Sequence, residues 1–301
     1  MPIIGRTNNH TPGETKMAKT PAAKKPAAKK APAKAAKSKY QFIIVTKRNR
    51  ICQIQFNRPE AMNALNVEMA KEITEVLIEV ETDRKIIAVI LSGNERAFCA
   101  GADLGRMGSK PSDRFDLYRE RFNIAPNRQM YRVLCFYTKP VISAVEGYCL
   151  GGGFETAMWG DFIVAGEGAQ FGLPEVRHSL IPGGGGTQNL PRLIGPALAK
   201  ELIWTGRRIK AAEAKELRIV NHVVPAGGAV KKAEEIVAEM AKNGPLGIMM
   251  SKVAINRGMD QSRFNGFLGE GDLAHMLTFS EDRPEGLKAF AERRQATFKG
   301  Q

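Results

Sequence analysis

Two carboxylic acids stand close to a run of glycines, and residues of these types could move protons on a substrate. The glycines 151–153 follow the apolar run Val141–Val145, Glu155 comes just after them, and Glu175 comes later, behind Phe171-Gly-Leu-Pro. The β-branched apolar run predicts a buried strand, and residues 154–159 predict a helix. A turn without side chains then leads into a helix whose first N–H groups lack partners, an arrangement that attracts negative charge. The pattern predicts proton transfer on a substrate that develops an oxyanion.

The three glycines alone have other interpretations. A dinucleotide-binding fingerprint needs a further glycine where Thr156 stands, and a phosphate-binding loop needs a Gly-Lys-Ser/Thr sequence, which is absent. A tight turn with close packing and no chemistry stays open for the glycines by themselves. The acids nearby favour the catalytic interpretation.

Length and composition indicate a globular protein. The chain has 301 residues, of which 43% are hydrophobic, enough for a substantial core in one or two domains. No apolar stretch approaches membrane-spanning length, so we expect a soluble, cytoplasmic protein. The four cysteines have neither metal-ligand spacing nor the density of a disulfide scaffold, which fits a reducing compartment. They are Cys52, Cys99, Cys135 and Cys149.

The net charge of +14 is concentrated near the N-terminus. Residues 1–39 carry ten Lys or Arg against one acid, Glu14, and from Ala18 onward this segment is almost entirely Ala, Lys and Pro. Such a composition cannot bury a core, so we predict a disordered tail. A tail of this kind could bind a polyanion weakly through counterion release, or it could be only a solubilising extension. Met17 is a candidate natural start.

The rest of the chain divides by its patterns. We predict a hairpin at residues 41–45 and 51–56, a helix at 67–80, a strand at 86–91 and a helix at 127–136. Beyond residue 175 helical patterns dominate, at 187–193, 197–204, 230–242, 248–257 and 285–298, with one strand at 220–224. This order predicts an α/β core at residues 40–235 and a helical C-terminal region at residues 236–301.

Six segments in one order resemble the crotonase (enoyl-CoA hydratase/isomerase) superfamily, and the resemblance covers residues 40–301. The segments are NRPEAMNAL (57–65), AFCAGAD (97–103), GYCLGGGFE (147–155), FGLPE (171–175), IPGGGGTQ (181–188) and SEDRPEG (280–286). The resemblance implies a crotonase-like spiral of ββα repeats and C-terminal helices that form a homotrimer, usually paired as a hexamer. It also implies an acyl-CoA thioester substrate.

The resemblance assigns roles to the glycine turn and to both acids. In the family two backbone N–H groups hold the thioester oxygen, and they correspond here to Ala102 and Gly152. Hydratases of the family carry both acids, whereas relatives with other reactions usually keep one or neither. The resemblance therefore implies that Glu155 and Glu175 share one water. We expect Glu155 to orient the water and Glu175 to protonate carbon, although the order of the two roles stays open.

Coenzyme A contacts follow from the same resemblance. Seven positions match residues that touch CoA in relatives, the last two across subunits: Ala61, Met62, Ala100, Asp103, Leu104, Phe290 and Arg293. Many relatives have a lysine where Gly105 stands, so the phosphate contact made there is in doubt. Amphipathic helix packing is the alternative explanation for the last two.

These observations lead to one expected activity and two alternatives. We expect an enoyl-CoA hydratase of fatty acid metabolism, a hydro-lyase that adds water syn to 2-enoyl-CoA thioesters without a metal or redox cofactor. A carnitinyl-CoA dehydratase or an enoyl-CoA isomerase of the same superfamily is the first alternative. The second is a nucleic-acid-binding protein that acts through its basic tail.

Overall fold

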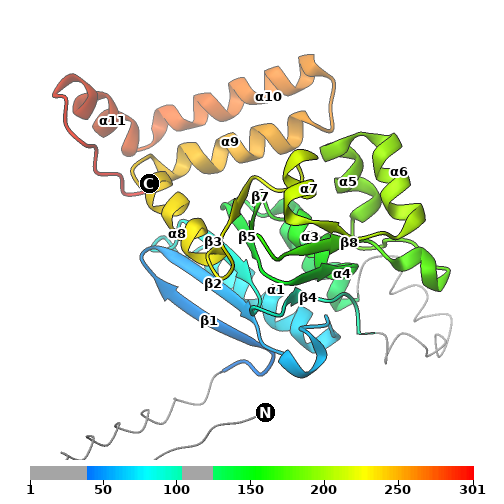
Figure 1. Ribbon diagram of the computed structural model, residues 1–301. Helices are drawn as coiled ribbons and strands as arrows, with labels where there is room; N and C mark the ends of the chain where they lie inside the picture. Colours follow the sequence, from blue (N-terminus) through cyan, green and yellow to red (C-terminus); the bar gives the residue numbers. More distant parts are fainter. Residues whose placement is uncertain (1–38, 104–124) are drawn as a thin grey trace, which may run out of the picture. The chain divides into compact units, whose positions relative to one another are not determined.

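The computed structural model describes residues 39–103 and 125–301, which belong to one compact unit (Figure 1). The predicted tail, apart from Lys39, and the CoA candidate Leu104 lie outside the described residues. None of the helices in the two described ranges has the length and hydrophobicity that a membrane span requires.

Two sheets form the centre of the unit. The larger sheet has the order β1-β2-β3-β5-β7-β10, with β1 antiparallel to β2 and the other pairs parallel. Its strands are β1 (Ile43–Arg48), β2 (Ile51–Phe56), β3 (Ala88–Ser92), β5 (Val141–Val145), β7 (Phe162–Gly166) and β10 (His222–Val224). The smaller sheet has the order β4-β6-β8-β9. Its strands are β4 (Ala97–Cys99), β6 (Tyr148–Leu150), β8 (Gln170–Gly172) and β9 (Ile209–Lys210).

The chain alternates between the two sheets. In each of the successive pairs β3/β4, β5/β6 and β7/β8, the first strand joins the larger sheet and the second joins the smaller one. Helix α3 (Pro126–Phe136) lies between the first and second pairs, and α4 (Gly152–Met158) lies between the second and third. This is the spiral of ββα repeats that the resemblance implied, and the α/β fold class is confirmed.

Helices cover both faces of the larger sheet. Successive side chains of a strand point to opposite faces of the sheet, so alternate residues of β3 and β5 belong to two different hydrophobic clusters. Ala88 and Ile142 pack with α8 (Ala229–Met240), while Val89 and Val141 pack in the cluster that contains α1 (Val67–Glu81) and α3. Strands buried on both faces read as continuous apolar runs, which is why β5 was recognisable in the sequence. The proposed domain border at residue 235 falls within α8.

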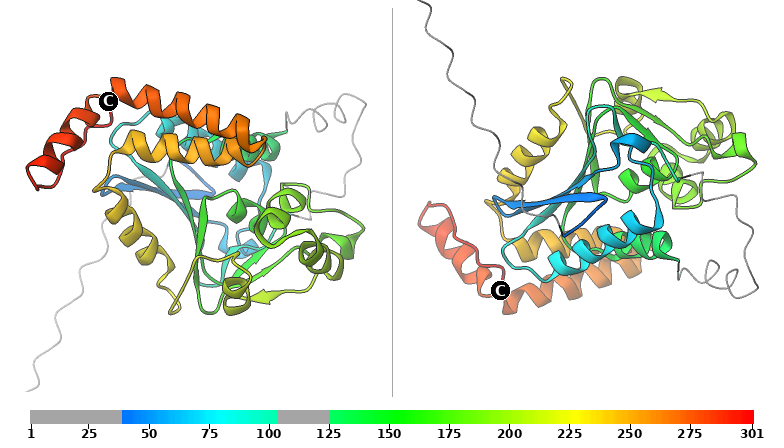
Figure 2. Two further views of the ribbon diagram at one scale, coloured as in Figure 1. Left: turned by 90° about the horizontal axis from the view of Figure 1, so that it is seen from above. Right: turned by 90° about the horizontal axis from the view of Figure 1, so that it is seen from below.

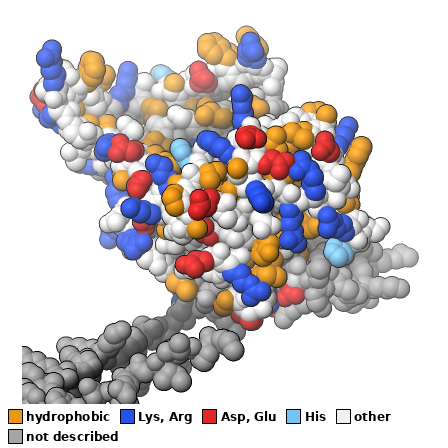
Figure 3. Space-filling view, in the orientation of Figure 1, with side chains coloured by type: hydrophobic (Ala, Val, Ile, Leu, Met, Phe, Trp, Pro, Cys, Tyr) orange, Lys and Arg blue, Asp and Glu red, His pale blue; other side chains and the backbone are white. Residues whose placement is uncertain are grey.

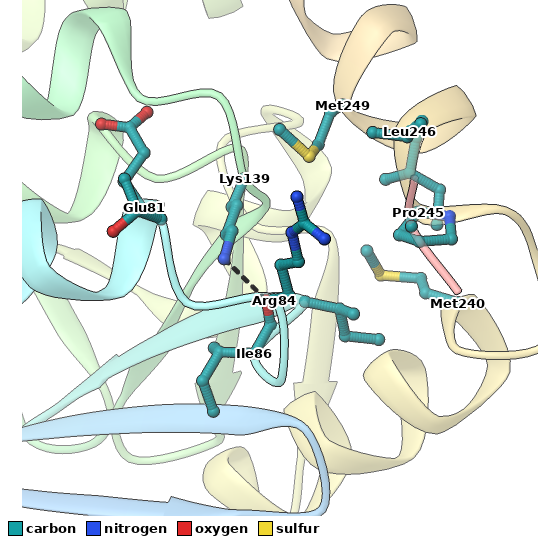
Figure 4. A pocket seen from close by; sticks show the side chains of 12 residues that line it. Glu81, Arg84, Ile86, Lys139, Met240, Pro245, Leu246 and Met249 are labelled. Carbon is teal, nitrogen blue, oxygen red and sulfur yellow. Dashed lines mark hydrogen bonds between the residues drawn. The ribbon is translucent and has the colours of Figure 1, made fainter. Parts of the chain in front are cut away.

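A buried lysine connects α1 to the sheet. Lys139 is 5% exposed, and its ammonium donates hydrogen bonds of 2.7, 2.7 and 2.8 Å to the carbonyls of Val80, Asp83 and Ile86. The close-up in Figure 4 shows the Ile86 bond inside a small pocket beside the C-terminal helices. Val80 lies in the last turn of α1 and the other two residues follow the helix, so one side chain joins the end of α1 to the chain that enters β3.

Of the remaining helices, the first three lie beside the spiral and the last three form the C-terminal region. They are α5 (Gly186–Ile194), α6 (Pro196–Thr205), α7 (Ala211–Glu216), α9 (Pro245–Gly258), α10 (Arg263–Met276) and α11 (Asp282–Ala291). Figure 2 shows α9 and α10 side by side, and a Cβ on Gly266 would lie only 3.2 Å from the Cα of Gly258. The two glycines therefore permit a close helix crossing.

The sequence prediction missed α10 and placed α11 too late. Three glycines lower the helical propensity of α10, which nonetheless begins at Ser262, whose hydroxyl accepts a 3.2 Å hydrogen bond from the N–H of Asn265. Helix α11 ends at Ala291 because Arg293 has a left-handed backbone with φ of 53°. The chain after it returns to Asp282, whose carboxylate accepts from the N–H groups of Lys299 and Gly300 at 2.6 and 2.8 Å.

The surface of the C-terminal helices is unusually apolar. Large hydrophobic side chains more than half exposed on α9, α10 and the segment that follows include Ile255, Met259, Phe264, Phe267, Leu268, Met276 and Phe279. Figure 3 shows one face of the molecule, and on the surface of the α/β part Lys and Arg are interspersed with Asp and Glu. Large exposed apolar faces on a globular unit indicate an association surface.

Candidate active site

The glycine turn joins β6 to α4. Gly151 has φ of 51°, a left-handed conformation that favours glycine, and its N–H donates a 2.9 Å hydrogen bond to the carbonyl of Gly172 in β8. Gly153 packs directly against the backbone of Cys99 in β4, where no Cβ would fit. The strand pairing and these two glycines together fix where α4 begins.

Two backbone amides meet beside this turn. Leu65 donates to the carbonyl of Gly101 at 2.8 Å and accepts from Asp103 at 3.0 Å, so the N–H of Ala102 between them points away from Leu65. The nitrogen of Ala102 lies 3.6 Å from where a Cβ on Gly152 would be. The N–H of Gly152 is in the first turn of α4, where helix donors lack intrahelical partners. The structure thus brings together the two amides that the resemblance selected.

Glu155 is buried next to this turn. It is 3% exposed, and its Oε1 accepts hydrogen bonds from the N–H groups of Gly184 and Gly186 at 2.7 and 2.8 Å. Burial raises the pKa of Glu155, while these two hydrogen bonds and the charge of Arg128 oppose the rise. One oxygen is therefore fixed by the backbone, and a Cβ on Gly184 would lie 2.7 Å from the other, Oε2.

Glu175 borders the same turn from the other side. It begins the 3-10 helix η3 (Glu175–His178), and its Oε1 lies 3.1 Å from where a Cβ on Gly151 would be. Its Oε2 is buried and has no hydrogen-bond partner among the described residues. Burial raises the pKa of Glu175 to about 7, its own backbone N–H opposes the rise, and the charge of Glu155 adds to it. The two acids are electrostatically coupled.

The sequence analysis did not select Tyr131 or Arg128, which also reach this site. The hydroxyl of Tyr131 donates to the carbonyl of Gly152 at 3.2 Å, and Thr156 donates to the same carbonyl at 2.7 Å. Arg128 donates to the carbonyl of Gly183 in the loop that holds Glu155. Helical periodicity places Tyr131 on the buried face of α3, but no motif marks either residue. Only the packing of α3 against the glycine loop reveals them.

Four CoA candidates lie near the Ala102 amide. Ala61 ends the 3-10 helix η1 (Pro59–Ala61), and the next carbonyl, that of Met62, accepts a 3.1 Å hydrogen bond from Ala100. Asp103 forms a 3.0 Å ion pair with Arg58, whose guanidinium also donates 2.5 Å to the carbonyl of Ala64. The 57–65 loop and the 97–103 segment are thereby held together beside the site.

The last two CoA candidates lie elsewhere. Phe290 belongs to α11 and is 87% exposed, and Arg293 follows that helix. In Figures 1 and 2, α11 lies apart from α4. Within one chain the structure does not bring these two residues to the glutamates, so their predicted contact requires another subunit.

A ββα spiral that places a buried glutamate and a half-buried glutamate, electrostatically coupled, beside two main-chain amides defines the class as an α/β protein equipped for acid–base chemistry. Comparison with known proteins then gives the family. The family described as Enoyl-CoA hydratase/isomerase matches residues 46–301, and the chain belongs to that family within the crotonase superfamily.

This chain aligns with individual relatives along nearly their whole length. The short-chain-enoyl-CoA hydratase of Clostridium acetobutylicum is 39% identical over 254 residues, which are 84% of this chain and 95% of the relative. The 2,3-dehydroadipyl-CoA hydratase of Escherichia coli is 36% identical over 86% of this chain and 98% of its own. The crystal structure of an enoyl-CoA hydratase from Bacillus anthracis is 39% identical, with a TM-score of 0.81, over 87% of this chain and 100% of that one.

Proposed function

We propose that this protein is an enoyl-CoA hydratase that adds water syn to a 2-enoyl-CoA and yields the 3-hydroxyacyl-CoA. The observation that supports it best is the pair Glu155 and Glu175, coupled across a turn that presents the amides of Ala102 and Gly152. Hydration needs one group that accepts a proton from water, one that delivers a proton to carbon, and donors for an enolate oxygen.

The main-chain amides act on the thioester carbonyl. When water attacks C3 of the substrate, negative charge develops on the thioester oxygen. The N–H groups of Ala102 and Gly152 are already in place there, so they need little reorganisation as the charge forms. The hydroxyls of Tyr131 and Thr156 hold the Gly152 carbonyl and thereby the backbone next to one of these donors.

The glutamates carry the protons. Glu155, held by Gly184 and Gly186, orients the water and in its ionised form accepts the proton of the water as the oxygen bonds to C3. Glu175, whose pKa of about 7 keeps a protonated fraction at neutral pH, delivers its proton to C2 as the enolate collapses. A proton must then pass from Glu155 to Glu175, through solvent, before the next turnover. Each product molecule gains one hydroxyl at C3 and one hydrogen at C2.

CoA binding and assembly complete the proposal. Ala61, Met62, Ala100 and Asp103 hold the CoA moiety largely through their backbone, and the chemistry uses no metal or redox cofactor. The exposed apolar side chains of α9 and α10 are buried between subunits of a homotrimer or a pair of trimers. In that assembly Phe290 and Arg293 reach the CoA of a neighbouring subunit. We place the enzyme in the cytoplasm.

The alternatives within the family differ in the acyl group or in what happens to the double bond. Relatives are named for a short-chain substrate and for dehydroadipyl-CoA, so family membership leaves the acyl group open. An isomerase would move a double bond without taking up water. A carnitinyl-CoA dehydratase would act on a thioester whose tail ends in a quaternary ammonium group.

A direct assay tests the proposal. Purified protein is mixed with crotonyl-CoA, and both the enoyl absorbance and the formation of 3-hydroxybutyryl-CoA are followed. We expect the absorbance to fall while the hydroxy product accumulates. Conversion of 3-enoyl-CoA to 2-enoyl-CoA without hydroxy product would favour the isomerase. No change in any 2-enoyl-CoA would overturn the proposal.

A further inference from the structure

A groove of about 470 Å³ lies next to Glu155. Tyr131 and Gly184 line it, and both also border Glu155, because a Cβ on Gly184 would lie 2.6 Å from the Tyr131 ring and 2.7 Å from the Glu155 carboxylate. One face of α3 forms one wall, and the loop before α5 forms the other. A substrate tail that extends beyond the reacting carbons has this groove available to it.

Positive charge dominates the groove. Its lining includes Arg128 and Arg132 from adjacent turns of α3, and the described residues of the lining contain no Asp or Glu. The first residues of α5 face the arginines, and a helix N-terminus carries partial positive charge. Glu155 borders the lining, where it accepts a hydrogen bond from the N–H of Gly184. Asp260 acts electrostatically on Cys135 in the lining and forms a 3.0 Å ion pair with Arg192.

Neither groove arginine has a carboxylate partner within the described ranges. Among the described residues no ion pair involves Arg128 or Arg132. Arg128 donates to the carbonyl of Gly183, which fixes its guanidinium at the mouth of the groove, and its charge acts on Glu155. Arg132 lies one helical turn further along and is exposed. Guanidinium groups bind carboxylates through paired, charge-assisted hydrogen bonds.

We propose that the groove binds the terminal carboxylate of the acyl chain, so that the preferred substrate is the mono-CoA thioester of a 2-unsaturated dicarboxylic acid. Arg132 is the specificity-determining residue, and Arg128 adds charge closer to the reacting carbons. This inference rests on the proposed hydratase activity and names its substrate class. A tail that ends in a quaternary ammonium is disfavoured, because two guanidinium groups repel it, although Trp159 in the same lining offers an aromatic face.

The test compares tails of equal length and different charge. Values of kcat/KM are measured for neutral 2-enoyl-CoA thioesters of six, eight and ten carbons and for their counterparts with a terminal carboxylate. We expect the carboxylate form to be favoured about tenfold at one of these lengths, the effect of one charge-assisted contact. The preference falls at high salt because the arginines are partly exposed. A thioester with a quaternary ammonium tail reacts more slowly than the neutral one.

Variants locate the recognition. Arg132→Gln lowers the carboxylate preference about tenfold, whereas Arg132→Lys, which keeps the charge, retains part of it. Arg48→Gln is the matched control. Arg48 ends β1, away from the groove, and forms an ion pair with Glu234 of α8, so its variant should keep the wild-type preference. Titration calorimetry with saturated thioesters, neutral and carboxylate, reports the same preference in binding without turnover.

The possible failures are distinguishable. Hydration of neutral substrates with no carboxylate preference at any length, or a preference that survives in Arg132→Gln, overturns the groove assignment and leaves the hydratase proposal intact. A faster reaction with the quaternary ammonium tail also overturns the assignment. Failure to hydrate any of these thioesters removes the proposed function and this inference together.

Discussion

The carboxylate of Glu155 accepts a 2.7 Å hydrogen bond from the N–H of Gly184, a residue 29 positions later in the chain. This contact joins the glycine turn at the start of α4 to the loop that precedes α5. It fixes one carboxylate oxygen, and the same loop reaches the groove lined by Arg128 and Arg132. One backbone segment therefore contacts both the proposed catalytic carboxylate and the groove proposed for the substrate tail.

Replacing either glutamate by glutamine is expected to remove most activity while the fold persists. Glu155→Gln and Glu175→Gln each lower kcat for crotonyl-CoA hydration about 10²- to 10⁴-fold, the usual contribution of a positioned acid or base. Steady-state kinetics measures the loss, and far-UV circular dichroism checks the fold. Glu167→Gln, at an exposed position in the turn after β7, is the control and keeps wild-type activity. Full activity in either site variant would exclude that residue from catalysis.

Stability should depend on pH through Glu175. Its folded-state pKa of about 7 exceeds the ordinary 4.5, so the folded protein binds the proton more tightly than the unfolded chain does. This stabilisation is complete below about pH 4.5 and is lost as pH rises through about 7. The contribution to the free energy of unfolding is at most about 3 kcal/mol, and it is smaller than this because Glu175 is partly exposed to solvent.

Glu175→Gln tests this linkage, because glutamine is neutral at every pH. Urea unfolding should show the variant gaining free energy of unfolding relative to wild type between about pH 4.5 and about pH 8.5. Glu167→Gln again serves as the control. If the difference between Glu175→Gln and wild type does not change with pH, the pKa of Glu175 is not raised.

Gly184→Ala should damage the site because no space exists for the methyl group. Its Cβ would lie 2.6 Å from the Tyr131 ring and 2.7 Å from the Glu155 carboxylate. We expect kcat/KM to fall at least about tenfold and the free energy of unfolding to fall by about 1–3 kcal/mol. In a Tyr131→Leu background the stability penalty should shrink, a coupling that a double-mutant cycle measures. Gly168→Ala, whose Cβ would meet nothing within 4 Å, should be neutral.

Lys139→Met should destabilise the fold without touching the site. The change removes the donor shared by the carbonyls of Val80, Asp83 and Ile86, of which the first two keep a backbone N–H donor. An unsatisfied buried acceptor costs about 1–3 kcal/mol, so we expect the free energy of unfolding in chemical denaturation to fall by about 1–3 kcal/mol. Lys71→Met on the exposed side of α1 is the matched control. Equal stability of the two variants would show that Lys139 does not stabilise the end of α1.

The apolar C-terminal surface predicts an oligomer. Light scattering should give a mass about three or six times the chain mass of 33.0 kDa. Phe264→Arg combined with Phe267→Arg, at side chains that are 69% and 68% exposed in the single chain, should lower the mass to that of one chain. Ile78→Arg, on the exposed side of α1, is the control and should keep the oligomer. A wild-type mass near one chain would refute the proposed assembly.

Local patterns determined much of the core from the sequence. The hairpin 41–45/51–56, the strand Val141–Val145 and α3 were predictable because burial on one or both sides leaves a periodic apolar signal. The strand β7 was missed, although Phe162-Ile-Val-Ala-Gly is a β-branched apolar run. Helix α10 was missed because its exposed apolar residues and glycines have no single buried face in one chain.

The residue types determined the chemistry, but the tertiary structure decided how they meet. The acids Glu155 and Glu175 stood out beside the glycine run, and the resemblance to the family added the amides of Ala102 and Gly152. The sequence could not show that burial raises the pKa of Glu175 to about 7, because desolvation depends on what packs around the carboxyl. Nor could it show that α3 turns two arginines toward the loop that holds Glu155. Such contacts join residues far apart in the chain, and only the packing of the whole spiral brings them together.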